Sequence, residues 1–118
     1  MTRIPDEDRQ ILEQAIFLPM LLTIFNRDIS IIESSPFKLR DPYIHLIEGA
    51  IKRVHKDLYL AKQQLKERKL KVYQIKRDDA FTLFSFIYKG YEEQHNYFNP
   101  RIRNEVTVLM EKYLIKHE

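Results

Sequence analysis

The chain has 118 residues, 20 basic and 17 acidic side chains, two glycines and no cysteine. Its length predicts one domain, since domains cluster at about 100–150 residues. The absence of cysteine excludes a disulfide scaffold, a thiolate zinc site and a thiol nucleophile, and neither glycine lies in a phosphate-binding loop. The charged start of the chain, MTRIPDEDRQ, is unlike a signal peptide, so we expect a cytoplasmic protein.

The first predicted element is a long helix over residues 5–34. Its internal Pro19 removes a backbone donor, which predicts a kink. The segment Ala15–Phe25 is apolar on every side, which is typical of a central helix or of one that meets a second subunit. The uncharged run from Gln14 to Asn26 has 13 residues, fewer than the ~20 that a membrane span needs, so no membrane association is expected.

A second helix is predicted over residues 42–67, after the break at Pro36 and with Pro42 in its first turn. Its apolar residues repeat at alternating steps of three and four, the pattern of a heptad seam. They are Ile44, Ile47, Ile51, Val54, Leu58, Ala61 and Leu65. Residues 68–77 do not keep this spacing, and a short extended crossover is favoured there over a continuation of the helix.

Two further helices are predicted, over residues 79–98 and 100–116. The first has an aromatic stripe at helical spacing, and Pro100 suits the first turn of the second. The stripe consists of Phe81, Phe84, Tyr88, Tyr91, His95 and Phe98, interpreted as core residues first and as a ligand-stacking surface second. The resulting prediction is an all-α fold, an antiparallel four-helix bundle whose first helix is long and kinked at Pro19.

Positive charge is concentrated in residues 52–77, which hold ten basic and two acidic side chains. The candidate binding residues are Lys62, Lys66, Arg68, Lys69, Lys71, Lys76 and Arg77. Such a patch could bind nucleic acid, an acidic protein or the acidic N-terminal half of another copy. The competing interpretation is a solvated helix end whose lysines complement the helix dipole.

One metal-like arrangement is present. Glu92 and His95 have the Glu-x-x-His spacing that two-metal carboxylate bundles use, and Glu48 and His55 could face the same interior. Such ligands suit iron or manganese. The alternative is that His95 is a hydrogen-bonded core histidine, in which case no cofactor is expected.

The function predicted from these features is a non-enzymatic helical interaction module. Its expected partner is a second copy of the chain or another protein. The all-round apolar segment Ala15–Phe25 and the aromatic surplus at Phe81, Phe84 and Phe86 favour a homodimer. Nucleic-acid binding by residues 62–77 and metal binding are the two alternative functions.

Three segments carry a resemblance to a known family: IPDEDR, ESSPFKLRDPY and GYEEQHNYFNPRIR. From about residue 4 to residue 115 the chain resembles the YhjD-like proteins, short polypeptides of spore-forming bacilli associated with sporulation. The resemblance implies a cytoplasmic, sporulation-linked setting and no established molecular activity. It supplies no catalytic or binding residues.

Overall fold

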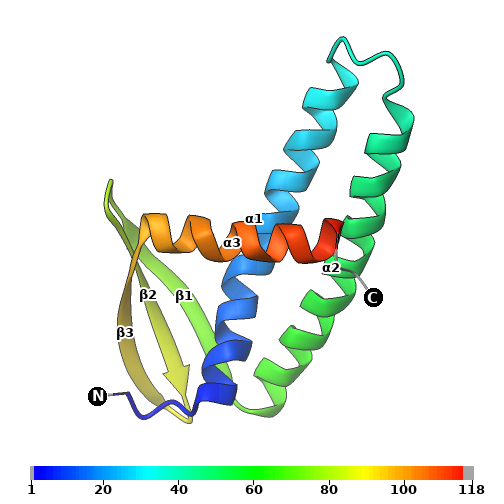
Figure 1. Cartoon of the computed structure of the whole chain (residues 1–118). Coiled ribbons are helices and arrows are strands. Elements are labelled where there is room, and N and C mark those ends of the chain that lie inside the picture. Colours follow the sequence, from blue (N-terminus) through cyan, green and yellow to red (C-terminus); the bar gives the residue numbers. More distant parts are fainter. Residues whose placement is uncertain (1, 116–118) are drawn as a thin grey trace.

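The computed structural model describes residues 2–115 as an α-helical hairpin, a three-stranded antiparallel sheet and a final helix (Figure 1). In chain order the elements are α1 (Asp6–Glu33), α2 (Asp41–Glu67), β1 (Leu70–Arg77), β2 (Phe81–Tyr88), β3 (Tyr91–Phe98) and α3 (Asn99–Leu114).

Helices α1 and α2 form a long antiparallel hairpin that projects away from the sheet (Figure 1). The seam of α2 faces α1, and its residues Ile47, Val54 and Leu58 are buried. At the opposite end from the loop, the Arg68 guanidinium joins the two helices by contacting the carboxylates of Asp8 at 2.6 Å and Glu7 at 2.9 Å. Part of the positive charge of residues 52–77 is therefore neutralised within the same chain.

The sheet has the strand order β1–β2–β3, and both connections are tight turns. Lys89 and Gly90 link β2 to β3 with φ angles of 50° and 85°, the left-handed conformation that two-residue hairpin turns of type I′ require. Between β1 and β2, the Asp78 carboxylate accepts hydrogen bonds from the backbone N–H groups of Ala80 and Phe81. These hydrogen bonds hold the pKa of Asp78 below its ordinary value.

One face of the sheet packs against the helices and forms the core. Phe84, Phe86 and Tyr97 lie on this inner face and are buried with Leu18 and Phe25 of α1. Helix α3 then lies across α1 toward α2 (Figure 1). Its last turn is fixed to α2, because the Arg53 guanidinium donates to the backbone carbonyl of Tyr113 at 2.7 Å.

The predicted all-α four-helix bundle is wrong. Residues predicted as one helix over 79–98 form the hairpin of β2 and β3. The extended conformation favoured for residues 68–77 is confirmed, and it forms the strand β1. Six of the eight residues of FTLFSFIY are apolar or aromatic, so a helical stripe can be drawn through this strand. Gly90, in the middle of the expected helix, marks the turn instead.

Helix α1 is continuous through Pro19. By length and composition it could cross a membrane, with a mean hydropathy of 1.6 over its most apolar window. However, Leu12, Leu18, Leu21 and Phe25 are buried against the rest of the chain, as in the core helix of a folded domain. The apolar segment that favoured a second subunit is thus largely covered by the sheet and the other helices.

Candidate functional site

The outer face of the sheet is not covered by any helix of residues 2–115, and large apolar side chains lie on it. α1 and α3 both pack on the other side (Figure 1). Tyr73 is 52% exposed, Phe81 39% and Phe98 49%, and the rings of Phe81 and Phe98 lie 5.4 Å apart. Leu83 and Ile87 between them are half-buried. We call these five residues, with Lys71 and Glu92, the open sheet face.

Charges lie at the two edges of the open sheet face. Lys71 on β1 and Glu92 on β3 are both register partners of Ile87, so the three residues form one row across the sheet. Two strand spacings of about 4.8 Å separate the Lys71 and Glu92 backbones. Glu92 accepts a short hydrogen bond from the Ser85 hydroxyl within its own sheet. The face therefore has a basic edge, an apolar centre and an acidic edge.

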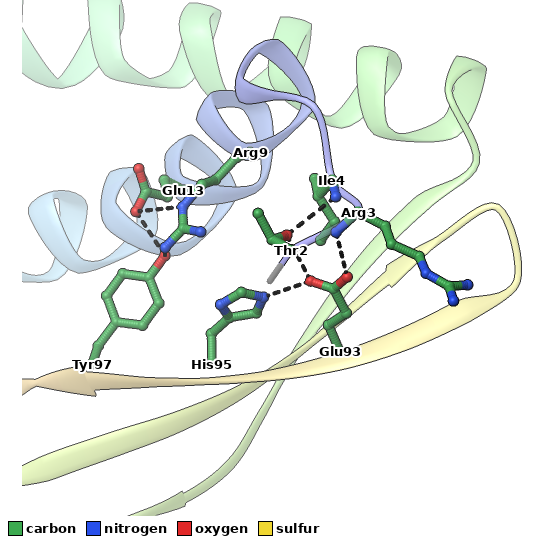
Figure 2. A network of polar contacts seen from close by, with 8 residues as sticks. All are labelled: Thr2, Arg3, Ile4, Arg9, Glu13, Glu93, His95 and Tyr97. Atoms are coloured by element: carbon green, nitrogen blue, oxygen red, sulfur yellow. Dashed lines mark hydrogen bonds and ion pairs between the residues drawn. The ribbon is translucent and has the colours of Figure 1, made fainter.

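The inner side of β3 holds the beginning of the chain (Figure 2). The Glu93 carboxylate accepts hydrogen bonds from the Thr2 hydroxyl at 2.7 Å and from the Arg3 backbone N–H at 2.8 Å, and it lies 3.0 Å from His95 Nε2. The Arg3 bond, followed by the Thr2 bond, lowers the pKa of Glu93 to about 2. The His95 ring stacks on Phe86, with 4.8 Å between ring centroids. His95 thus acts as a hydrogen-bonded, stacked side chain of the fold.

A second polar group lies beside the first in Figure 2 and joins β3 to α1. The buried Tyr97 hydroxyl donates to the Glu13 carboxylate at 2.7 Å. Arg9 and Arg101 lie 4.0 and 3.6 Å from the same carboxylate, and the Arg101 guanidinium covers the Tyr97 ring. Burial, and then the Glu13 bond, raise the pKa of the Tyr97 hydroxyl. Two guanidinium groups and the Tyr97 hydroxyl share the one Glu13 carboxylate, so the group ties β3 and α3 to α1.

Comparison with known proteins gives the family. A family model described as YhjD protein matches residues 3–118. The chain belongs to the YhjD family. It is 46% identical over 114 residues to the uncharacterized protein YhjD of Bacillus subtilis strain 168, covering 97% of this chain and 95% of that relative. No solved structure matches the chain.

The structure separates the four residues that the sequence suggested as metal ligands for this YhjD family member. Glu92 and His95 are three apart in a strand, so they point to opposite faces of the sheet. Glu48 and His55 lie on α2 and are exposed. Within residues 2–115 no three His, Asp or Glu side chains are grouped as metal ligands. The iron or manganese hypothesis required Glu92 and His95 to lie on one helix, and both residues lie on the strand β3 instead.

The basic residues of 62–77 are also divided among different surfaces. Lys62 and Lys66 lie on the last turns of α2, and Lys69 occupies the turn into β1 with a φ of 56°. Lys71 and Lys76 are partners of outer-face residues, whereas Arg77 pairs with Thr82 on the inner face. Arg68 is held by Glu7 and Asp8. The seven residues therefore lie on α2, on the turn into β1 and on both faces of the sheet, and Lys71 is the one that belongs to the open sheet face.

The open sheet face was missed because its residues come from three segments. Alternation of Phe81, Leu83 and Ile87 with the buried Thr82, Phe84 and Phe86 is the local signal that could have indicated it.

Proposed function

We propose that this YhjD family protein is a non-enzymatic interaction module that pairs with a second copy of itself through the open sheet face. The observation that carries the proposal is the row of Lys71, Ile87 and Glu92 across an uncovered apolar face. The proposed activity is self-association. The surfaces outside the dimer contact stay available for binding other partners.

The apolar content of the face favours a protein partner. Phe81 and Phe98 adjoin each other, and Tyr73, Leu83 and Ile87 lie on the same face of the curved sheet, around the buried Ser85 (Figure 1). Contiguous exposed patches of this kind are uncommon in monomers and mark interaction surfaces. Two sheets that stack face to face lie about 10 Å apart and bury such side chains between them.

The charges favour a second copy as that partner. A two-fold axis parallel to β2 places β1 of one copy over β3 of the other, because the rotation exchanges the two edges of the sheet. It preserves the position along the strands, so Lys71 then faces Glu92 of the other copy, twice by symmetry, while Ile87 meets Ile87. Three strands of eight residues give a footprint of about 14 by 26 Å, which is small and predicts weak, micromolar association.

Charge reversal tests this arrangement. We expect sedimentation velocity to show a monomer–dimer equilibrium for the native chain, and Lys71→Glu or Glu92→Lys each to weaken it about tenfold through like-charge repulsion. The double variant restores the pairing with the charges exchanged. Lys62→Glu and Glu48→Lys on α2 are matched controls that leave the equilibrium unchanged.

Two outcomes would contradict the dimer. One is a native chain that stays monomeric up to about 100 µM, well above the expected dissociation constant. The other is a double variant that dimerises no better than the single variants, which would show that Lys71 and Glu92 do not face each other in the dimer.

Single-stranded nucleic acid is a second candidate partner for the same face. Tyr73, Phe81 and Phe98 are exposed on the side of the sheet that also carries Lys71 and Lys76. Bases of any sequence stack on aromatic rings, and lysines beside them attract the phosphates. This juxtaposition of aromatic and basic residues arises only once the strands are paired.

Fluorescence anisotropy with a labelled single strand of about 15 nucleotides distinguishes the two candidates. Nucleic-acid binding predicts affinity that falls steeply between about 50 and 200 mM salt and is lost in Tyr73→Ala. Glu92→Lys distinguishes the two hypotheses, because it is expected to weaken the dimer and to strengthen binding to the phosphates of a nucleic acid. No affinity at low salt would remove this candidate.

We also propose that the protein acts in the cytoplasm of sporulating cells, the setting that the resemblance implies. Immunoblots of cells sampled through growth and sporulation should show the protein in the soluble fraction and rising during sporulation. A constant level, or a protein that sediments with membranes, would contradict this setting.

A further inference from the structure

A cavity of about 250 Å³ lies between α1, the inner side of β1 and β2, and α3. We propose that it binds a small organic anion with one carboxylate and a compact apolar body. The proposal is independent of the open sheet face, which lies on the other side of the sheet.

One part of the cavity wall is apolar. Met20 and Ile24 contribute from α1, and Ile102, Val106 and Met110 from α3. The two methionines are unbranched and adapt to the shape of a bound group. A ligand that fills this space therefore needs an apolar portion.

Two arginines line the remaining part of the cavity without an acidic partner. Within residues 2–115, no carboxylate lies within 4.0 Å of the Arg77 or Arg103 guanidinium, and neither side chain donates a hydrogen bond, whereas Arg68 and Arg101 both contact carboxylates. Both arginines are exposed residues on the wall of the cavity. Two guanidinium groups that line one site favour an anion, and a planar carboxylate matches their donor geometry.

Three other polar side chains on the cavity wall, Thr82, Asn99 and Thr107, are engaged within the chain, and the fourth, Gln74, is a neutral amide. The Thr82 hydroxyl donates to Asn99 Oδ1 at 2.7 Å, and Asn99 Nδ2 donates to the backbone carbonyl of Asp78 at 2.9 Å. The Asp78 carboxylate accepts two backbone N–H groups of its own turn. The arginines are thus the charged donors left to receive the ligand, which selects an anion over a neutral molecule.

The volume sets the size of the ligand. A dry cavity of about 150 Å³ holds benzene, which has six non-hydrogen atoms. By proportion, a cavity of about 250 Å³ holds roughly ten. Octanoate has a carboxylate and a short apolar chain of about this size and serves as the probe.

Titration of the full chain with octanoate tests the site. Isothermal titration should show saturable binding, and the methyl resonances of Met20 and Met110 should shift at the same concentrations. 1-Octanol, which lacks the charge, is expected to bind at least about tenfold more weakly, and acetate, which lacks the chain, not to bind.

Surface variants complete the test without disturbing the core. Arg77→Gln and Arg103→Gln are each expected to weaken octanoate binding about tenfold and to leave octanol binding unchanged, whereas Lys62→Gln on α2 changes neither. Absence of octanoate binding, equal affinity for octanol, unshifted Met20 and Met110 methyls, or an equal loss in Lys62→Gln would each overturn the proposal.

Discussion

The ionisation of Glu93 is tied to the fold. Its carboxylate receives the Thr2 hydroxyl and the Arg3 backbone N–H, and these bonds hold its pKa at about 2 against an ordinary value of 4.5. A lowered pKa in the folded state means that the ionised form stabilises the fold. This contribution is complete above pH about 4.5 and is lost as the pH falls toward 2.

Replacing Glu93 with Gln should therefore make the free energy of unfolding depend less on pH below about pH 4.5. We expect Glu93→Gln to cost about 1 to 2 kcal/mol at neutral pH, since it removes charge-assisted hydrogen bonds, and the difference from the native chain to shrink between pH 4.5 and 2. Urea denaturation at a series of pH values measures it. Glu105→Gln on α3 is the matched control, and an unchanged difference across this range would refute the assignment.

At the scale of elements, the β2–β3 hairpin depends on its two-residue turn. Gly90 has a φ of 85°, and a Cβ added there would meet no atom within 4 Å. Gly90→Ala should therefore destabilise the protein through backbone strain alone, by about 1 kcal/mol. Lys89→Asn, at a φ of 50°, should be neutral or slightly stabilising because Asn tolerates this conformation.

Thermal and urea unfolding of the two turn variants measure this effect. The control is Gly49→Ala inside α2, where the added Cβ would lie at an ordinary van der Waals distance of 3.5 Å from the Arg53 side chain and alanine favours the helix. A loss of stability in Gly49→Ala equal to that in Gly90→Ala would show that the turn conformation is not the cause.

The same hairpin shows how far the sequence predicts this fold. The helical segments near 5–34, 42–67 and 100–116 correspond to α1, α2 and α3, because caps, prolines and heptad steps are local signals. β2 and β3 were wrongly predicted as a helix. β2 is apolar at most positions and so fits both periods, and Tyr91, His95 and Phe98 of β3 extended the same helical spacing. A glycine inside a helix costs about 1 kcal/mol, so Gly90 was the local evidence against that prediction.

The candidate site was harder to predict than the helices, for a physical reason. Lys71 and Glu92 are brought into one row only by the register of two successive strand pairings. Charge counting identified residues 52–77 as a basic segment that could face an acidic partner or solvent. It could not show that Arg68 finds acidic partners in Glu7 and Asp8 of its own chain.

The whole molecule is elongated. Its radius of gyration is 16.2 Å, against about 13 to 14 Å for a compact chain of this length, and its longest extent is 53 Å. The distal part of the α1–α2 hairpin explains the difference, because no side chain between residues 26 and 46 is buried. Only the two helices support each other there.

Hydrogen exchange should report this division of the molecule. We expect amides in residues 27–33 of α1 to exchange well before those in residues 12–25, because the distal turns can open without disrupting the core. Mass spectrometry of exchanged peptides measures the order, with β2 as the protected reference. Equal protection along α1 would mean that the hairpin opens only when the whole protein unfolds.

The attachment of the first residues to β3 has a practical consequence for handling the protein. Thr2 and Arg3 lie against Glu93, so a peptide tag fused ahead of them would have to leave the molecule beside that carboxylate. Such a fusion could loosen the contact and alter the measured stability. Tags and fluorophores are better attached after α3, whose last turn rests on α2 away from this contact.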